Sequence, residues 1–194
     1  MKNKKFVIIA GVAVCGISAL VSLAFLSDSK SVFNTFKEKG NGSVELIETD
    51  WNEENAKSIY PQQKIAKNPQ LKNTGNIDEY GYLQVAVPIK SVRTVSTADE
   101  SIQEAKPTEL FTYKVNEDWV LLDTKSDEGY SIKVYGYKNS IPCGELTSSL
   151  FKEVNYTNVL QGELSDKSEL DIKVQGIGIQ SKNNDSMELA YKGV

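Results

Sequence analysis

Apolar side chains recur at every second position in several stretches of this chain, which is the pattern of strands with one face buried and one face in water. The clearest case is the stretch 64–88, where the alternating apolar residues are Leu83, Val85 and Val87. Asn73 and Gly75 precede this alternation, and both residue types tolerate the positive φ that a hairpin reversal needs. We therefore predict a central hairpin: a strand, a tight turn at 73–76 in which Gly75 holds a positive φ, and a second strand.

Pro69 interrupts the first half of this central hairpin. A proline has no N–H to donate to a strand ladder, so it is confined to edge strands or bulges. The first strand of the central hairpin is therefore predicted to lie at a sheet edge or to carry a bulge.

Further strands are predicted downstream. A turn at 127–129 leads into a tyrosine-rich strand at 130–137, with Ile132 and Val134 on one face and Tyr135 and Tyr137 on the other. Two shorter strands, at 110–115 and 119–122, are predicted to form a hairpin around residues 116–118. In the last long strand the alternation set by Leu170, Ile172 and Val174 shifts to Ile177 and Ile179. Gly176 and Gly178 lie at the shift, which predicts a β-bulge there.

Helix signals are few. Asp50 can cap a short helix over residues 51–58. Thr97 and Glu100 have the spacing of a capping box, and Pro107 would end a helix that begins there. With roughly seven to nine strands expected, residues 43–194 are predicted to form one all-β domain. The predicted fold is an antiparallel, jelly-roll-like β-sandwich with one or two short surface helices.

The N-terminal segment has the pattern of an export signal. Three lysines precede an uncharged, mainly apolar run at 6–26, and Ser22 and Ala24 are small residues at the −3 and −1 positions of a cleavage site before Phe25. Residues 1–24 are therefore predicted to be a signal peptide with an apolar helix. An uncleaved membrane anchor is the alternative, because a run of roughly 20 residues is long enough to span a bilayer. In that case the only membrane contact would be through residues 6–26, with the domain outside.

The charge and cysteine content limit the classes of binding partner and the disulfides that this chain can have. The net charge is −4 and the pI is about 5.1, which argues against nucleic acid because such binding needs a basic stripe. Cleavage before Phe25 would also remove Cys15 and leave Cys143 alone. A single cysteine cannot form an internal disulfide, so Cys143 is either a small buried hydrophobic residue or the site of an intermolecular disulfide. We predict that Cys143 is a small buried hydrophobic residue.

The chain of 194 residues contains no histidine. This excludes Ser-His-Asp, Cys-His and HExxH sites. Two pairs of neighbouring acids remain, Asp78/Glu79 and Asp127/Glu128, but adjacent residues of a strand point to opposite faces. We therefore predict no catalytic residues, no cofactor and no metal. The tyrosines could form an exposed aromatic ladder, or could pack across strands within the domain, which we favour. They are Tyr80, Tyr82, Tyr130, Tyr135 and Tyr137.

A series of motifs in this order resembles the TasA/camelysin group of secreted Gram-positive proteins. The group has an Asn-Thr-Gly turn before a Tyr-led strand of alternating valines. It also has a Trp, an acidic-Gly-Tyr turn, a Pro-x-Gly bend and a Leu-Phe-x-x-Val motif. Here the corresponding residues are Trp119, Asp127, Glu128, Gly129, Tyr130, Pro142, Gly144, Leu150, Phe151 and Val154. Near the N-terminus Phe25, Asp28, Asn34, Phe36, Gly42 and Glu48 match further positions, and near the C-terminus Ile179, Gln180 and Ala190 do.

The resemblance implies a secreted or cell-surface protein of a biofilm matrix whose signal peptide is removed by a SipW-type signal peptidase. It also implies that the protein assembles with itself into fibres. Camelysin-type members of the group have been described as metalloproteases, and the absence of histidine argues against that activity here.

Residues 25–42 form an N-terminal arm between the signal peptide and the first strand. Phe25, Phe33 and Phe36 make this arm too apolar for a solvated tail. We expect the freed arm to pair with an open sheet edge of another subunit, which would build filaments. Two alternatives are that these rings pack on their own domain or continue a membrane helix. A different class of function also stays open, a membrane-anchored binding domain for a glycan or a surface ligand.

Overall fold

The computed structural model describes residues 43–52, 59–164 and 170–193. Most of the regular structure in this part of the chain is β-strand, with one short helix, as the alternating pattern predicts. The elements, in chain order, are β1 (Val44–Ile47), β2 (Lys64–Ala66), β3 (Gln70–Asn73), β4 (Glu79–Val92), β5 (Lys106–Glu109), β6 (Phe111–Tyr113), β7 (Trp119–Asp127), β8 (Tyr130–Tyr137), β9 (Glu153–Tyr156), β10 (Lys173–Gln180) and α1 (Met187–Lys192).

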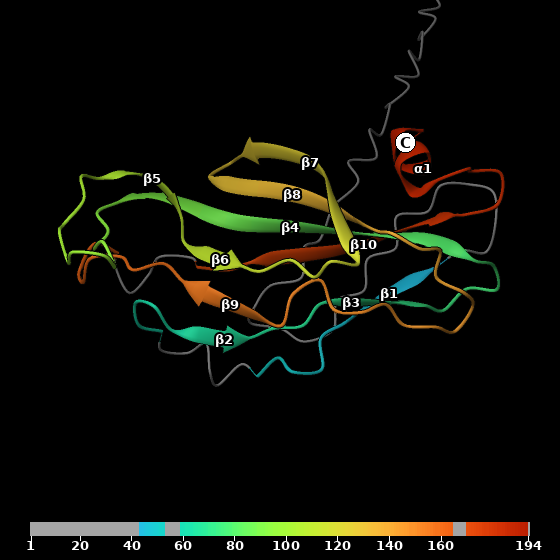
Figure 1. The fold of residues 1–194 in the computed structure, drawn as a ribbon, viewed down its shortest axis with the longest axis horizontal. Coiled ribbons are helices and arrows are strands. Elements are labelled where there is room, and N and C mark those ends of the chain that lie inside the picture. The colour runs from blue at the N-terminus through green and yellow to red at the C-terminus, as the bar shows by residue number, and fades with distance from the viewer. Residues whose placement is uncertain (1–42, 53–58, 165–169, 194) are drawn as a thin grey trace, which may run out of the picture.

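The strands form two layers, which Figure 1 shows nearly edge-on. One layer is an antiparallel five-stranded sheet in the order β10-β4-β8-β7, in which β5 pairs with the far end of β4. The other layer contains the three-stranded sheet β2-β9-β6 and the two-stranded sheet β1-β3. The 14-residue strand β4 is the centre of the larger sheet, because it pairs with three other strands.

The main hydrophobic core lies between the two layers. Alternate residues of β4, among them Leu83, Val85 and Val87, point into this core and are fully buried, as the sequence pattern predicts. The opposite layer contributes Leu71, Phe111, Phe151 and Val154. A second, smaller cluster forms on the outer face of the larger sheet, where Tyr82 and Val134 pack against Met187 of α1.

The helix α1 covers the outer face of the large sheet at one end. Ser186 caps its N-terminus, because its side chain accepts a hydrogen bond from the backbone N–H of Leu189. The Tyr82 hydroxyl donates to the backbone oxygen of Met187 at 2.7 Å. A buried methionine and one tyrosine hydroxyl thus hold this short helix on the sheet.

The central hairpin predicted for residues 64–88 does not form. This stretch contains three strands: β2 pairs with β9, β3 pairs with β1, and β4 pairs with β5, β8 and β10. Pro69 lies between β2 and β3, where the chain passes from one small sheet to the other. The prediction was that the strand containing Pro69 lies at a sheet edge or carries a bulge. Pro69 itself lies in no strand, and β2 before it is at an edge of its sheet. A pattern of alternation indicates which face is buried but not which strand is the neighbour.

Gly75 is not among the residues with a positive φ, so that prediction is wrong. The turn is instead organised by the side chain of Asn73, which is fully buried. Its Oδ1 accepts the N–H of Gly75 at 2.9 Å, and its Nδ2 donates to the backbone oxygens of Ile77 and Ile141 at 2.7 and 2.8 Å. A side chain that satisfies the backbone in this way removes the need for a left-handed residue.

The predicted strand at 130–137 is confirmed as β8, and it forms a two-residue hairpin with β7. Glu128 and Gly129 have φ values of 46° and 82°, as a tight hairpin turn requires. The hairpin predicted between 110–115 and 119–122 is wrong, because β6 pairs with β9 in one layer and β7 pairs with β8 in the other. Residues 114–118 therefore cross between the layers.

The predicted β-bulge at Gly176 and Gly178 is also absent, because β10 pairs with β4 in one continuous register. The shift in the apolar pattern has another cause. Val174 points into the main core, whereas Ile177 and Ile179 point to the second cluster on the outer face. Two apolar clusters on opposite faces of one strand produce the same sequence pattern as a bulge.

The helix predicted to begin at Thr97 is a loop. Residues 97–99 form a turn, and Val95 and Ile102 bridge the two sides of the loop as an antiparallel pair. Pro107 belongs to β5. Ile102, which was expected on the apolar face of this helix, is 58% exposed. The apolar face that would hold a surface helix on the domain is therefore not buried here. Trp51 and Asn52 are not helical, and the rest of the helix predicted at 51–58 lies outside the described residues.

Glycines allow the small β1-β3 sheet to approach the large one closely. A Cβ on Gly176 would lie 2.6 Å from Cδ2 of Leu71, and a Cβ on Gly81 would lie 2.9 Å from Cδ1 of the same leucine. A Cβ on Gly81 would also lie 2.5 Å from Cδ1 of Ile141. These glycines form a flat surface against which Leu71 packs.

Gly81→Ala is therefore expected to lower the free energy of unfolding by about 1–3 kcal/mol, the usual range for overpacking a core. Chemical denaturation followed by intrinsic fluorescence would measure it. Gly193→Ala is the matched control, because a Cβ there meets no atom closer than 3.6 Å and its φ is −77°. Equal stability of the two variants would contradict the proposed close packing at Gly81.

Candidate functional site

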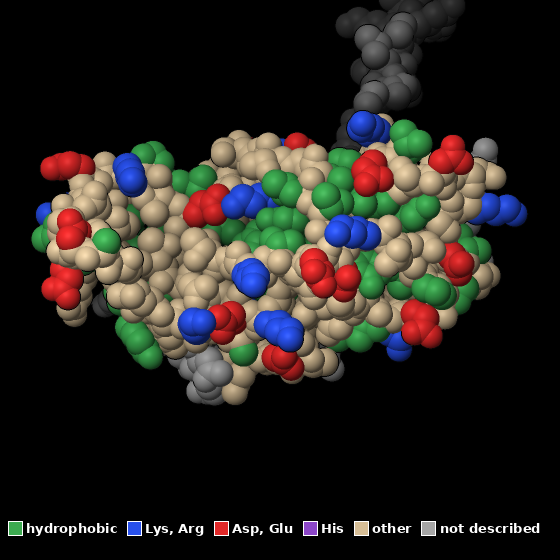
Figure 2. Space-filling model, viewed as in Figure 1, with side chains coloured by type: hydrophobic (Ala, Val, Ile, Leu, Met, Phe, Trp, Pro, Cys, Tyr) green, Lys and Arg blue, Asp and Glu red, His purple; other side chains and the backbone are tan. Residues whose placement is uncertain are grey.

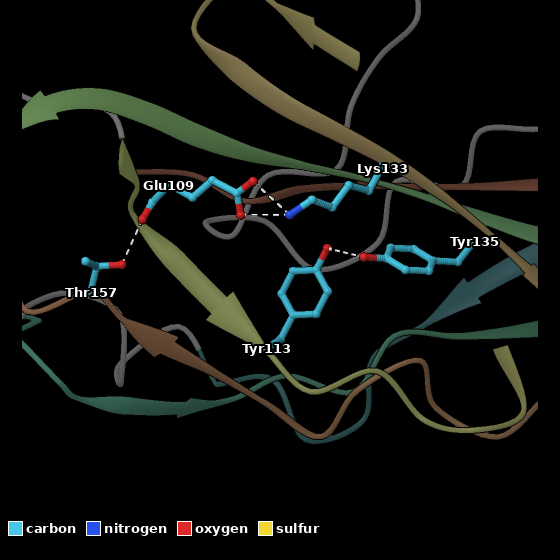
Figure 3. Close-up of polar contacts among 5 residues, drawn as sticks. All are labelled: Glu109, Tyr113, Lys133, Tyr135 and Thr157. Atoms are coloured by element: carbon cyan, nitrogen blue, oxygen red, sulfur yellow. Dashed lines mark hydrogen bonds and ion pairs between the residues drawn. The ribbon is translucent and has the colours of Figure 1, made fainter. Parts of the chain in front are cut away.

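Two pairs of polar side chains meet where β6 and β8 face each other across the layers (Figure 3). The hydroxyl oxygens of Tyr113 on β6 and Tyr135 on β8 lie 3.1 Å apart. The ring of Tyr113 also stacks on that of Phe151, with centroids 4.4 Å apart. Burial raises the pKa of both tyrosines. These two phenols are therefore neutral at physiological pH, and they join the layers by one hydrogen bond.

Beside them, the Nζ of Lys133 lies 2.8 Å from each carboxylate oxygen of Glu109. Thr157 donates from its hydroxyl to the backbone oxygen of Glu109 at 2.8 Å. The ammonium and the carboxylate are occupied by each other and are both partly exposed. This arrangement connects β5, β8 and the end of β9, and it offers no activated nucleophile or base.

The tyrosines that could have formed a ladder are divided among separate environments. Tyr82 is buried on the outer face under α1, while Tyr135 is buried in the main core. Tyr137 packs against Trp119, and the ring of Tyr130 lies 4.2 Å from the Nζ of Lys173. The packing interpretation is confirmed for Tyr82 and Tyr135, and the five rings do not form one exposed ladder.

Neither acid pair lies within one strand, because Glu79 begins β4 after Asp78, and Asp127 ends β7 before Glu128 in the turn. Only the first pair divides into a buried and an exposed side chain. Glu79 is 1% exposed, whereas Asp78, Asp127 and Glu128 are exposed. Among the described residues, no group of three or more His, Cys, Asp or Glu side chains could hold a metal ion. In the same part of the chain, no helix is long and apolar enough to cross a membrane.

Cys143 is exposed, which corrects the expectation of a small buried residue. It lies in the turn between Ile141 and Gly144, and Gly144 has a φ of 81°. Ile141 is the buried residue of this turn, with 1% exposure. The apolar positions of a bend cannot be assigned by periodicity, because its backbone is irregular.

From residue 174 to residue 180, the outer edge of β10 carries no charged side chain. Ser181 donates from its backbone N–H to the oxygen of Asp78, opposite β4. Because antiparallel backbone groups alternate in direction, the N–H and C=O groups of Val174, Gly176 and Gly178 face away from β4. No strand in the described part of the chain pairs with that side.

The opposite edge of the sheet, β7, differs in character. It carries Asp123, Lys125 and Asp127, and its register shifts between Leu121 and Asp123. Charged side chains and bulges are the features by which natural proteins prevent strand edges from pairing. The edge of β10 lacks both features from residue 174 to residue 180.

The predicted acceptor edge, the strand with Pro69, is largely occupied. The backbone of β3 pairs with β1 on one side and is bonded by residues 144–147 on the other, through Asn73 to Gly144 and Glu145 and through Leu71 to Thr147. The three-residue strand β2, which precedes Pro69, lies at one edge of its sheet.

A polar cavity of about 600 Å³ opens at one end of the sandwich. Residues 94–99 of the β4–β5 connection line it together with β5 and with Thr157 and Asn158, which follow β9. No pattern in the sequence indicated this cavity, because its walls are brought together from three separate segments.

The cleavage-site residues Ser22, Ala24 and Phe25 and the arm residues Phe33 and Phe36 lie outside the described residues. Among the described residues, the open edge of β10 is a candidate site for another strand, and the polar cavity is a candidate site for a small ligand. Comparison of the chain with protein-family models, curated proteins and solved structures finds no match.

Proposed function

We propose that this chain is an exported, non-enzymatic structural protein of the cell surface or biofilm matrix that assembles with itself into fibres. The observation that carries the proposal is the outer edge of β10, which is uncharged from residue 174 and unpaired among the described strands, in a chain with an export pattern at its N-terminus. We further propose a jelly-roll-like sandwich of the TasA/camelysin type, processed before Phe25 by a SipW-type signal peptidase. The family assignment is supported by the motif order of the sequence and by the all-β fold.

Assembly would proceed by strand addition. An extended segment that pairs with an open edge satisfies the exposed backbone groups of both chains, and pockets along the edge select its side chains. The arm at 25–42 directly precedes β1 and is released when the signal peptide is cut. Donation of this arm from one subunit to the β10 edge of the next is a heterologous contact, which does not close and so produces filaments.

The chemistry of the two edges favours β10 as the acceptor. Its outward groups at Gly176 and Gly178 have no side chain in the plane of the sheet edge, and no charged residue follows until Lys182. An apolar arm with Phe25, Phe33 and Phe36 would meet no unpaired charge on that edge. On β7 the same arm would have to pass Asp123, Lys125 and Asp127.

A non-enzymatic role is supported by the residues present. The chain has no histidine, and the partly buried Lys133 is engaged by Glu109. Figure 2 shows basic and acidic side chains interspersed over one face of the molecule. This mixed distribution fits a partner other than nucleic acid.

The test compares protein that begins at Phe25 with protein that begins at Gly42, at matched concentration. Light scattering and negative-stain microscopy are expected to show filaments only with the arm present. Amide hydrogen exchange shows where the arm binds. The N–H groups of Gly176 and Gly178 are expected to be protected only in the longer protein, because the arm supplies their acceptors.

The result has three informative alternatives. Filaments from both proteins, or from neither, would show that the arm is not the donor strand. Protection of Gly176 and Gly178 in a longer protein that stays monomeric would place the arm on its own domain. A separate measurement on the full chain tests export. Mass spectrometry that finds residues 1–24 on the protein in membrane fractions would identify the uncleaved anchor, and a mature form in the medium that starts at Phe25 would exclude it.

A further inference from the structure

The polar cavity is built by a loop insertion at the end of the sandwich, away from the β10 edge. Between β4 and β5 the chain makes an excursion over residues 93–105, and this excursion folds against the segment after β9. The volume of about 600 Å³ is in the range of small-ligand sites. Its polar and charged lining includes Thr94, Thr97, Asp99, Gln103, Lys106 and Asn158.

Backbone pairing holds the cavity walls in place. Val95 and Asn158 are joined twice: the N–H of Val95 donates to the backbone oxygen of Asn158, and Nδ2 of Asn158 donates to the backbone oxygen of Val95, both at 2.8 Å. Thr94 pairs with Val159, and Val95 pairs with Ile102 across the loop. The N–H of Gln103 also donates to the oxygen of Thr94 at 2.8 Å. A cavity held by so many backbone contacts is preformed, so a ligand would bind without ordering the loop.

An ion pair anchors the base of the loop. The Nε of Arg93 donates to Oε1 of Glu163 at 2.7 Å, and its backbone N–H donates to Oε2 at 3.0 Å. This contact neutralises the only arginine of the chain, so its charge is not available to a ligand.

The lining contains many groups that hydrogen-bond, beside an apolar surface of similar extent. Five of the eleven lining residues carry a hydroxyl, two carry a side-chain amide, and none is aromatic. In the described structure the hydroxyls of Thr94 and Thr97 make no hydrogen bond within the protein. Such a lining matches a ligand that is itself covered with hydroxyl groups.

Asp99 supplies one oriented carboxylate. Its Oδ1 accepts the N–H and the hydroxyl of Ser101, at 3.2 and 2.8 Å. Hydrogen bonds from Ser96 and Ser101 hold the pKa of this carboxyl below its ordinary value, so it stays ionised. A carboxylate fixed in this way can accept hydrogen bonds from two neighbouring hydroxyls of one ligand.

The charge around the cavity selects against anions. Asp99, Glu100 and Glu104 lie on the loop, and Lys106 is the cationic residue of the lining. A phosphate or a uronate would therefore meet a net negative loop.

We propose that this cavity is a binding site for a neutral, polyhydroxylated ligand, namely one or two sugar units of an oligosaccharide. Asp99 and the amides of Gln103 and Asn158 would accept and donate hydrogen bonds to ring hydroxyls, while Thr94 and Thr97 would contact the same sugar from the loop. Binding is weak, because no aromatic ring offers a stacking surface. The site is independent of the β10 edge, so it does not rest on self-assembly.

The experiment is a titration of isotope-labelled protein beginning at Gly42, provided that its amide spectrum shows the dispersed signals of a folded β protein. Otherwise the protein beginning at Phe25 is used. The probes are laminarihexaose, mannohexaose and chitohexaose, with hexagalacturonate as the anionic comparison. At least one neutral probe is expected to shift the amide signals of residues 94–103 and 157–159 in a saturable way, and hexagalacturonate is expected to bind at least tenfold more weakly.

Two substitutions test the assignment of residues. Asp99→Asn keeps an oxygen that can accept from Ser101 but removes the charge, and it is expected to weaken binding about tenfold, as for loss of a charged hydrogen-bond acceptor. Glu104→Gln is the matched control, since it removes the same charge from the same loop but does not line the cavity; its affinity should stay within about twofold. An unchanged amide spectrum in the absence of sugar confirms that each variant is folded.

Several results would overturn the proposal. One is that no neutral probe shifts these signals at 20 mM, a concentration about twentyfold above a weak 1 mM dissociation constant. Others are that the shifts map elsewhere, that hexagalacturonate binds as well as the neutral probes, or that Asp99→Asn and Glu104→Gln lose affinity equally.

Discussion

Replacing Lys67 with methionine is expected to lower the free energy of unfolding by about 3–5 kcal/mol, the range for removing one partner of a buried ion pair. The side chain of Lys67 is 2% exposed, and its Nζ lies 2.7 Å from Oε1 of Glu48, whose side chain is 16% exposed. Methionine would fill the space of the lysine but leave a carboxylate without its counter-charge. Urea denaturation at pH 7 would measure the difference.

Two comparisons make the Lys67 prediction specific. Lys64→Met removes an ion pair with Glu153 whose side chains are 66% and 44% exposed, and it should cost less than about 1 kcal/mol. The double variant Lys67→Met/Glu48→Gln should recover part of the loss, because no charge is then buried alone. A double variant as unstable as the sum of its two single changes would show that the pair is not coupled.

The buried lysine has a role beyond its ion pair. Burial lowers the pKa of Lys67, and Glu48 opposes that shift. The ring of Trp51 lies 5.1 Å from Nζ. The neighbouring Asn68 accepts the N–H of Asp50 and donates to Thr49. Together, these contacts fix the segment that follows β1 against the segment between β2 and β3.

Sequence alternation predicted the class of fold because it reports burial directly. The strands around Leu83, Val134 and Val174 were predicted from period two, and all three residues lie in strands and are buried. The β7–β8 hairpin was also predictable, since its Glu128-Gly129 turn carries a residue type suited to a positive φ. In both cases the information is local to the segment.

Pairing partners were not predictable, because they depend on contacts between distant segments. The pattern of residues 64–88 is the same whether β3 pairs with β4 or, as observed, with β1. The turn after β3 was assigned to Gly75, but Asn73 organises it through an oxygen of Ile141, 68 residues away. The helix predicted to begin at Thr97 does not form, because the backbone of this loop has other hydrogen-bond partners. Local bonds from Ser101 to Asp99, a bridge across the loop and a bridge to Val159 offered the backbone a better arrangement.

Neither candidate site could be read from the sequence. The open edge of β10 is defined by what does not pair with it, which only a topology can show. The buried charges Lys67 and Glu79 break the usual rule that such residues are solvated. Lys67 lies two positions before Pro69 outside any strand, so no alternation pattern indicated its burial.

The stability of the protein is expected to fall as pH rises from about 4.5 to about 7, through the ionisation of Glu79. Burial raises the pKa of its carboxyl to about 7. Its Oε2 is buried with no hydrogen-bond partner, and its backbone is fixed to Ile141 by two hydrogen bonds of 3.1 and 2.6 Å. Val44 and Gly178 pack around the carboxyl, and burial is the one cause of the shift, with no charged group opposing it.

The direction of this change in stability with pH follows from proton binding. Between these pH values the folded chain keeps the proton of Glu79 while the unfolded chain loses it, so each step up in pH favours unfolding. The contribution is fully present below the pKa of the unfolded state and is lost as pH passes the folded pKa. A shift from 4.5 to about 7 corresponds to a loss of about 3 kcal/mol.

Glu79→Gln isolates this effect, because glutamine has a similar shape and cannot ionise. The free energy of unfolding of the variant minus that of the unchanged protein is expected to rise by about 3 kcal/mol between pH 4 and pH 8. Any constant cost of burying the amide cancels in this difference, and so do the other titrating groups. Asp78→Asn is the control at the neighbouring exposed acid, and it should give a difference that varies by less than about 0.5 kcal/mol over the same range. Urea denaturation in buffers of equal ionic strength measures all three proteins. A difference for Glu79→Gln that is flat with pH would mean that the carboxyl is solvated, and that β1 does not seal it against the large sheet.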